Sequence, residues 1–175
     1  MIVAGVTLLA IAGTVLAVYL RPSPTHIAQF HYEFTVPDGW EQISSNTDLR
    51  EVDLHPTGET GTTAKIIVEE FELDYDATAD RARAVNQLRE DYGKKRSQNS
   101  RSKFDGFDEN ATFAGRKVIY YNERDATGPV DWYADWYVVL QGKYEVSVGC
   151  QHGGDSEAER VKAACDRVVR SLTIR

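Results

Sequence analysis

The chain has 175 residues, which suits one domain, or one domain with a membrane anchor. Its hydrophobic content of 42% and charged content of 27% are those of a globular protein, so most of the chain is expected to fold. The formal net charge of −7 argues against a nucleic-acid-binding protein, because such proteins neutralise several phosphates with a basic surface.

An uncharged apolar stretch at the start of the chain is typical of a membrane-spanning helix. It runs from Ile2 to Leu20, and a helix of that length spans about 28 Å, close to the thickness of a bilayer's hydrocarbon core. Arg21 follows at the expected interface. We therefore predict a transmembrane helix over residues 1–21 and a linker over residues 22–28. A cleaved signal peptide is the alternative, but its apolar core would be shorter and would follow basic residues.

Residues 29–175 are predicted to form one α+β domain. Apolar and polar side chains alternate over residues 30–36, as in a half-buried strand. The VPDGW segment at 36–40 is typical of a turn and is expected to start a first hairpin. Residues 64–73 are rich in Ile, Val and Phe, which predicts a central strand.

A helix is predicted after the central strand, capped by Asp76 or Thr78. Its apolar stripe consists of Ala82, Val85, Leu88 and Tyr92. Gly93 is expected to end this helix. The basic run at 94–103 is then interpreted as a solvated loop, with contact to anionic lipid headgroups as the alternative.

The last part of the chain predicts an antiparallel meander followed by a helix. Residues 130–140 alternate strictly, and the return strand carries Val146, Val148 and Cys150 on one face. Ser156 and Glu159 form a capping-box pattern for the final helix. Its apolar stripe consists of Ala158, Val161, Cys165, Val168 and Leu172. The expected fold class is therefore α+β, an antiparallel sheet packed by helices and preceded by one transmembrane helix.

The two cysteines are expected to lie in the same layer. Cys150 is on the sheet face that carries Val146, and Cys165 is on the apolar stripe of the final helix, so a disulfide would join helix to sheet. Two buried thiols are the alternative. A zinc site is not expected, because His152 and the cysteines lack evident third and fourth partners. Two signals disagree on which side of the membrane the domain lies. By the positive-inside rule, the single charge of Arg21 favours a cytoplasmic domain. The even cysteine count favours an extracytoplasmic domain, which we expect.

The aromatic cluster at 132–137 contains the candidate contact surface. Trp132 and Trp136 share the core-facing side of the predicted strand. Tyr133, Asp135 and Tyr137 alternate onto the other side, where the two tyrosines offer large contact areas with a polar end. We predict that these three residues form a surface patch, although ordinary packing of the strand would also explain the pattern.

Catalytic motifs give no support for an enzyme. The sequence lacks a Gly-x-Ser-x-Gly elbow, a His-Glu-x-x-His helix and a glycine-rich phosphate loop. Its four histidines are scattered. We therefore expect a non-enzymatic protein without a metal or another cofactor.

Three segments resemble the C-terminal domain of the type VII secretion-associated proteins of actinobacteria. They are GRKVIYYNE at 115–123, VDWYADWYVVLQGKYEVSVGCQ at 130–151 and AACDRVVRSL at 163–172. The VPDGW segment also fits the start of such domains. The fold is more loosely similar to the α/β/α sandwich of PsbP and Mog1-like proteins.

The resemblance implies an accessory protein of a type VII secretion system that acts by protein–protein contacts. Its partners would be membrane proteins of the secretion system, and its domain would lie outside the cell membrane on a single-pass anchor. The alternative is an extracytoplasmic module that binds a lipid or another cell-envelope ligand.

Overall fold

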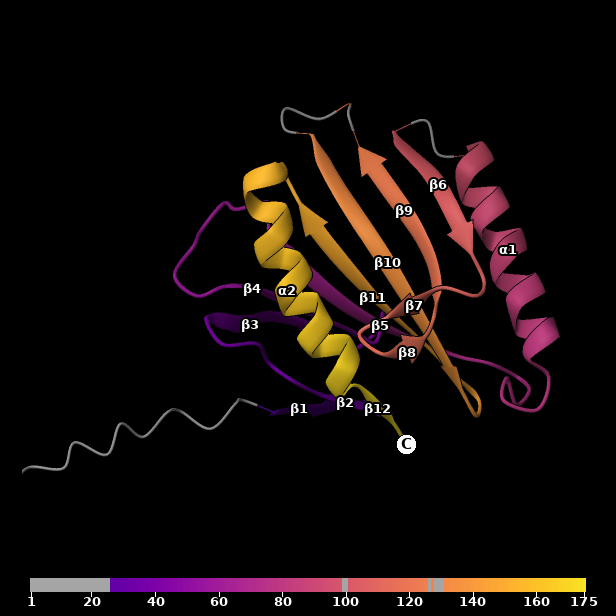
Figure 1. Cartoon of the computed structure of the whole chain (residues 1–175). Helices are drawn as coiled ribbons and strands as arrows, with labels where there is room; N and C mark the ends of the chain where they lie inside the picture. The colour runs from indigo at the N-terminus through magenta and orange to yellow at the C-terminus, as the bar shows by residue number, and fades with distance from the viewer. Residues whose placement is uncertain (1–25, 99–100, 126, 128–130) are drawn as a thin grey trace, which may run out of the picture.

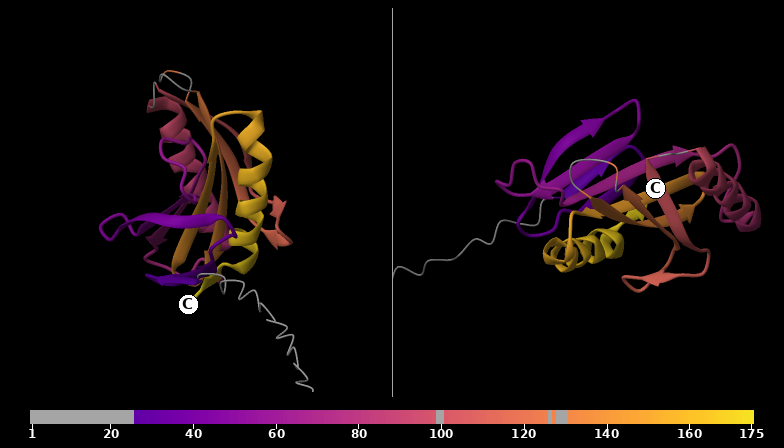
Figure 2. Two further views of the ribbon diagram at one scale, coloured as in Figure 1. Left: turned by 90° about the vertical axis from the view of Figure 1, so that its left-hand side faces the viewer. Right: turned by 90° about the horizontal axis from the view of Figure 1, so that it is seen from above.

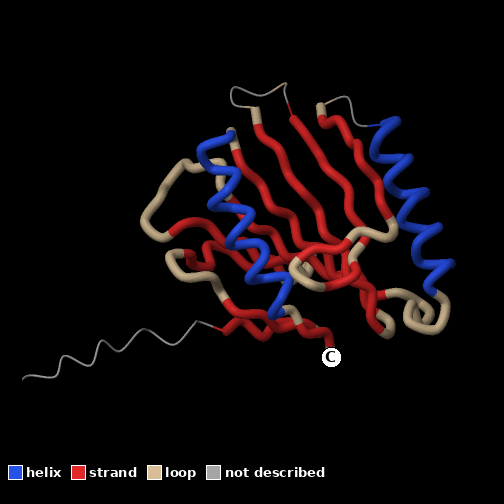
Figure 3. The backbone as a smooth tube through the Cα atoms, viewed as in Figure 1, coloured by secondary structure: helices blue, strands red, loops and turns tan. Residues whose placement is uncertain are grey.

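In the computed structural model, residues 26–98, 101–125, 127 and 131–175 are described, and a seven-stranded antiparallel sheet is their largest element (Figure 1). In spatial order the sheet consists of β3 (Trp40–Asn46), β4 (Glu51–Pro56), β5 (Lys65–Glu72), β11 (Tyr144–His152), β10 (Trp132–Gln141), β9 (Ile119–Asp125) and β6 (Ser102–Asp108). Two helices, α1 (Arg81–Gln98) and α2 (Asp155–Ser171), lie on opposite faces of this sheet (Figures 2 and 3). The expected α+β class with antiparallel strands and packed helices is confirmed.

Two small sheets complete the domain. The first has the order β1 (His26–Gln29), β2 (Tyr32–Thr35) and β12 (Thr173–Ile174), so it joins the first described strand to the end of the chain. The second is the hairpin of β7 (Thr112–Phe113) and β8 (Arg116–Lys117). Figure 1 shows the three-stranded sheet at one end of the domain, near the C-terminus.

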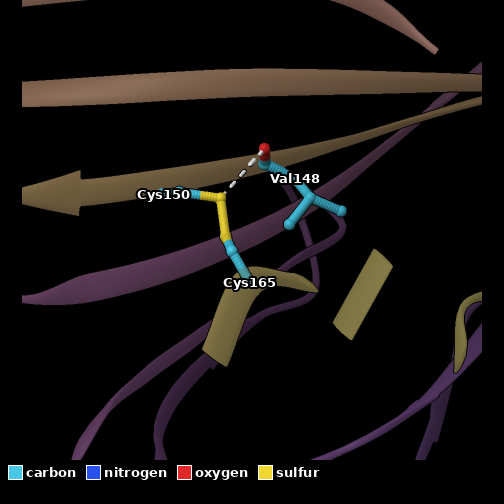
Figure 4. The surroundings of a disulfide bond; sticks show 3 residues. All are labelled: Val148, Cys150 and Cys165. Carbon is cyan, nitrogen blue, oxygen red and sulfur yellow. Dashed lines mark hydrogen bonds between the residues drawn. A yellow bond between two sulfur atoms is a disulfide. The ribbon is translucent and has the colours of Figure 1, made fainter. Parts of the chain in front are cut away.

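The larger core lies between α2 and the sheet. Val161, Cys165 and Val168 of α2 are at most 1% exposed, because they pack on alternate residues of β5 and β11. Cys150 and Cys165 form the predicted disulfide, with their Cα atoms 6.1 Å apart (Figure 4). The bond therefore fixes the middle of α2 to β11.

The second core lies between α1 and the opposite face. Val85 and Leu88 are buried there against side chains of β6, β9 and β10. The expectation that Gly93 ends this helix is wrong, since α1 continues to Gln98. Tyr92 packs beside this glycine against Phe104 of β6, so tertiary contacts outweigh the low helix propensity of glycine.

The basic run at 94–103 is not a loop throughout, as had been expected. It supplies the last turn of α1 and the start of β6. In β6 the side chains of Ser102 and Phe104 are buried, whereas Lys103 between them is exposed. A strand therefore begins inside a segment whose composition is typical of a solvated loop.

Two local predictions near turns are also wrong. The VPDGW turn connects β2 to β3, which belong to different sheets, and the first hairpin is instead β1–β2, with Phe30 at a φ of 53° in its turn. Ser156 does not cap α2, because the N-cap is Gly154, which has no side chain. Glu157 instead holds the turn before α2 in place. Its carboxylate accepts hydrogen bonds from the Gly153 amide at 2.8 Å and the Thr63 hydroxyl at 2.6 Å.

Glu70 is a buried carboxylate that joins three segments. It is 2% exposed, and it accepts hydrogen bonds from the His31 amide at 2.8 Å and from Arg50 Nη1 at 2.7 Å. The His31 ring nitrogen Nδ1 lies 2.9 Å from Glu70 Oε1, the oxygen that also accepts from Arg50. These contacts tie the β1–β2 and β3–β4 turns to β5, and they compensate a charge that would otherwise be costly to bury.

The predicted anchor bounded by Ile2, Leu20 and Arg21, and most of the linker, lie outside the described residues. Within the described part, neither helix is both long and apolar enough to cross a membrane.

Replacing both Cys150 and Cys165 with alanine is expected to lower the free energy of unfolding by about 3 kcal/mol, because the disulfide closes a loop with a sequence separation of 15. Urea unfolding of the full chain in nonionic detergent measures this change. Ser156→Ala is the control and should leave the unfolding midpoint unchanged. A loss below about 1 kcal/mol in the double variant would contradict the prediction.

Replacing Arg50 with methionine is expected to destabilise the domain by about 3 kcal/mol, because the Glu70 charge stays buried with fewer partners. Adding Glu70→Gln should recover part of that loss. The control is Arg83→Met, which breaks an exposed pair with Asp74 and should cost at most about 0.5 kcal/mol. Equal losses in Arg50→Met and Arg83→Met, measured by the same urea titration, would refute this account.

Candidate interaction site

The candidate contact residues lie on the face of β10 that also carries α2. Tyr133 is 36% exposed, and Asp135 is half-buried. The Asp135 carboxylate accepts a hydrogen bond from the Tyr120 hydroxyl at 2.8 Å. Burial, followed by this hydrogen bond, raises the pKa of Tyr120 to about 12, so the hydroxyl keeps its proton and remains a donor.

Tyr137 does not belong to an exposed patch, which corrects the prediction. It is 7% exposed, and its ring stacks on Phe113 of the β7–β8 hairpin with 3.8 Å between centroids. Burial raises the pKa of its hydroxyl above the ordinary value. The sequence of β10 could not show that Tyr137 is buried, because the hairpin that covers it comes from a separate segment of the chain, before β9.

The expectation that Trp132 and Trp136 face the core is confirmed for Trp136, which is 9% exposed, whereas Trp132 is half-buried. Trp136 Nε1 donates a hydrogen bond to Glu123 at 3.2 Å. Its ring also requires a glycine at position 149, since a Cβ there would lie 2.7 Å from the ring. This close packing fixes the register of β10 against β11.

A row of side chains crosses four strands on the α2 side of the sheet. The register pairs Lys103 of β6 with Arg124 of β9, Arg124 with Tyr133, and Tyr133 with His152 of β11. The Arg124 guanidinium lies 5.1 Å from the centre of the Tyr133 ring, and the Tyr133 and His152 rings are stacked at 5.6 Å. We call these four residues the basic row.

The basic row lines an open groove. This groove, here called the β10 groove, has a volume of about 360 Å³ and is lined by Lys103, Asp105, Asn122, Glu123, Arg124, Tyr133, Asp135 and His152. A second hollow of about 220 Å³ shares Asp135 and His152 and extends to Lys162 of α2. The N-terminal half of α2 therefore forms one wall of this second hollow.

The β10 groove lies at the end of the sheet opposite to β1. Its residues come from the start of β6, the end of β9, the start of β10 and the end of β11, all at the upper end of the sheet in Figure 1. β1 and the C-terminus lie at the lower end. The point where the described chain begins and the groove are thus far apart.

His152 is one of the groove residues that the sequence analysis missed as binding residues. Its side chain is half-buried, and its Nδ1 atom is buried without a hydrogen-bond partner. The sequence could have indicated the direction of its side chain, because His152 follows Cys150 by two residues and so lies on the same face of the strand. Among the described residues, no group of three or more His, Cys, Asp or Glu side chains is arranged to hold a metal ion.

A pair of carboxylates lies on the opposite face of the sheet. Glu69 of β5 and Glu145 of β11 are half-buried, and burial raises the pKa of each to about 7. The charge of Glu69 raises the pKa of Glu145 further, whereas Lys95 of α1 lowers both. This pair lies on the face opposite to Tyr133, and its protonation is expected to affect the stability of the domain.

No family model matches the chain, and no curated protein matches it. Solved structures do match. LpqN of Mycobacterium tuberculosis, a protein involved in cell envelope biogenesis, is 15% identical with a TM-score of 0.52, over 89% of this chain and 87% of LpqN. The cyanobacterial PsbP of Synechocystis is 16% identical with a TM-score of 0.52, over 87% of this chain and 93% of its own.

Two other matches have lower TM-scores. A protein of Bacteroides thetaiotaomicron is 13% identical with a TM-score of 0.49 over 83% of this chain, and the chain spans 45% of its length. Mog1p of Saccharomyces cerevisiae also matches, at 11% identity over 87% of this chain and 96% of its own, with a TM-score of 0.44. At these identities the likeness concerns the fold alone. The expected similarity to PsbP-like domains is confirmed at that level, and membership of the type VII secretion family is not.

The domain is expected to lose stability as the pH rises from about 4.5 to 7, because Glu69 and Glu145 hold their protons more tightly when folded than when unfolded. Their contribution is fully present below pH 4.5 and is lost as the pH passes 7. In the double variant Glu69→Gln, Glu145→Gln, the free energy of unfolding should fall by on the order of 3 kcal/mol less over this pH range than in the wild type. Urea unfolding at several pH values measures this difference.

The control for that measurement is Glu90→Gln, which removes an exposed carboxylate from α1. It should retain the wild-type pH dependence. A double variant with the same slope as the wild type would show that the carboxylate pair does not couple folding to pH.

Proposed function

We propose that the chain is a single-pass membrane protein whose extracytoplasmic domain serves as an accessory component of a type VII secretion system. The domain acts by protein–protein contacts with membrane proteins of that system. The observation that carries this proposal is the β10 groove, an open, aromatic and charged surface at the end of the domain opposite to β1. The type of secretion system is proposed from the resemblance to type VII secretion-associated proteins, which lies in residues 115–123, 130–151 and 163–172.

The disulfide supports the extracytoplasmic side. Cys150 and Cys165 are 3% and 0% exposed and are bonded to each other, and such bonds persist in oxidising compartments. The disulfide outweighs the single positive charge at Arg21, since one basic residue is weak evidence for orientation.

The position of β1 supports an orientation of the domain. If the apolar stretch ends at Leu20, only a few residues separate it from His26, and five extended residues reach at most about 18 Å. The β1 end would then face the membrane, and the β10 groove would face away from it. A groove in that position is available to other proteins of the envelope.

A protein surface fits the groove better than the alternative lipid-binding module. Between α2 and the strands beneath it, the side chains of Val161, Cys165 and Val168 are at most 1% exposed, so that interface is packed rather than hollow. The groove itself is lined mainly by charged and polar side chains, whereas lipid chains favour apolar cavities. The absence of enzymatic activity stays a prediction.

Tyr133→Ala is expected to reduce the recovery of the secretion channel or its ATPase at least about fivefold when the chain is purified from native membranes in mild detergent, because an exposed tyrosine is a common interface anchor. Mass spectrometry quantifies the recovered proteins against a topology-matched membrane protein. The control is Phe71→Ala, which removes an aromatic ring that is 46% exposed elsewhere.

Each variant must keep the thermal unfolding midpoint of the wild type. If no secretion component is enriched with the wild-type chain, the proposed function is wrong. Recovery of lipid in place of those proteins would favour the ligand-binding alternative.

A further inference from the structure

We infer that the β3–β4 hairpin, residues 40–56, lies on the bilayer surface, with the side chains of Ile43 and Leu49 inserted among the lipids. Such a contact goes beyond the proposed protein contacts and rests on one part of the proposed function, the membrane anchor. It fixes the orientation of the domain, which the length of the tether alone leaves open.

The β3–β4 hairpin presents apolar side chains in a long exposed run. Residues 41–49 are all exposed. Ile43 and Leu49 are 48% and 58% exposed, the highest values for large apolar side chains in the part of the chain that the structure describes. Single exposed apolar residues are common on protein surfaces, so the position of these two relative to the anchor decides what they mean.

A β-bulge leaves Ile43 without a partner on β4. The register of β3 against β4 shifts between Gln42 and Ser44, so Ile43 is the extra residue of β3. β3 is an edge strand of the sheet, and bulges at edges interrupt strand pairing and re-aim a side chain. The bulge therefore disfavours the addition of a strand from a second protein, and it leaves the apolar side chain as the group that this edge offers.

Leu49 belongs to an ordered turn. The Asn46 side chain accepts hydrogen bonds from the amides of Asp48 and Leu49 at 3.0 and 3.1 Å. The next residue, Arg50, has a φ of 50°, and its Nη1 donates to the buried Glu70 carboxylate at 2.7 Å. A non-glycine residue in the left-handed region is strained and persists only where its surroundings hold it. A leucine that is exposed on such a turn points to a binding role.

Two contacts place the hairpin beside β1, where the tether enters the domain. The Ser45 hydroxyl of β3 donates to Gln29 Oε1 of β1 at 2.7 Å. The buried Glu70 carboxylate joins the turn of the hairpin to the β1–β2 turn. Five residues separate the apolar stretch from His26, the first residue of β1, and they reach at most about 18 Å. The bilayer would then lie below the domain as drawn in Figure 1, next to this hairpin.

The anchor makes so small an apolar contact sufficient. Two apolar side chains would hold a free domain on a bilayer only weakly, since binding scales with the apolar area that is buried. A short tether converts this binding into an intramolecular step, with an effective concentration of about millimolar. With both the tether and the hairpin at the bilayer, the domain cannot turn about the tether. The β10 groove at the opposite end is then directed away from the lipids.

The charge of the hairpin favours an electroneutral lipid surface. The exposed run at 41–49 contains two acidic residues, Glu41 and Asp48, and no basic residue. Anionic headgroups attract basic segments and would repel these two carboxylates. The contact is therefore apolar, and anionic lipid should not strengthen it.

The test places a fluorescent label on the full chain in phosphatidylcholine vesicles. The two cysteines of the sequence are bonded to each other, so one added cysteine takes an environment-sensitive label. Ile43→Cys and Leu49→Cys should each lose at least about half of their emission when the lipids carry a spin label high on the acyl chain, because interfacial side chains reach roughly 5–10 Å into a bilayer. The control is Ser156→Cys in the exposed first turn of α2, which should keep its emission.

A second substitution separates insertion from closeness to the bilayer. In the chain labelled at Ile43→Cys, Leu49→Glu should reduce the quenching at least about threefold, because a charged side chain opposes insertion among lipids. Gln87→Glu, an equal charge change at an exposed residue of α1, should leave the quenching unchanged. Every variant must keep the thermal unfolding midpoint of the wild type.

Three results would overturn the membrane contact. The first is quenching at neither hairpin position, or equal quenching at Ser156→Cys. The second is a blue-shifted label on the hairpin without quenching by the lipids, which would show that a second copy of the chain covers it. The third is a chain that does not float with the vesicles, which would remove the anchor itself.

The vesicles contain no secretion component, so this measurement is independent of the co-purification. Quenching at the hairpin without enrichment of a secretion component would retain the membrane contact and refute the secretion role. Enrichment of a secretion component without quenching at the hairpin would refute the membrane contact alone.

Discussion

The attachment of α2 to the centre of the sheet is the constraint on which the rest of the structure depends. The helix presents one apolar stripe, and the strands below it present alternate apolar residues, so burial fixes the face on which α2 lies. The disulfide between Cys150 and Cys165 fixes its position along β11. Because α2 lies over β5 and β11, neither helix of the described residues covers the same face of β9 and β6.

The groove follows from this unequal coverage. At one end of β10 the β7–β8 hairpin covers the sheet and buries Tyr137 under Phe113. At the other end none of the described elements covers Tyr133, so its ring is 36% exposed beside Arg124 and His152. Two tyrosines on the same face of one strand thus differ in exposure, because the β7–β8 hairpin lies over Tyr137 and not over Tyr133.

Buried charge is distributed differently on the two faces. On the α2 side, Glu70 pairs with Arg50 and accepts a hydrogen bond from the His31 amide, which ties the β1–β2 and β3–β4 turns to β5. On the α1 side, burial raises the pKa of both Glu69 and Glu145, and the charge of Glu69 raises that of Glu145 further. Glu70 is thus held by specific partners, whereas burial favours the protonated forms of Glu69 and Glu145.

The elements with strong periodicity could be predicted from the sequence alone, and so could the fold class that follows from them. The alternation in β10 and β11, the stripe of α2, the α+β class and the Cys150–Cys165 bond all follow from local spacing, because a strand repeats every two residues and a helix every 3.6. Local patterns failed where distant segments decided the outcome, as at Gly93 and in β6.

The candidate site depends on how strands far apart in the sequence pair. The basic row joins residues of β6, β9, β10 and β11, and no local pattern specifies how these strands align. Their register depends on side chains that meet across the sheet, such as Trp136 over Gly149. Composition and periodicity describe what each segment can bury. Which exposed side chains become neighbours is fixed only when the strands pair.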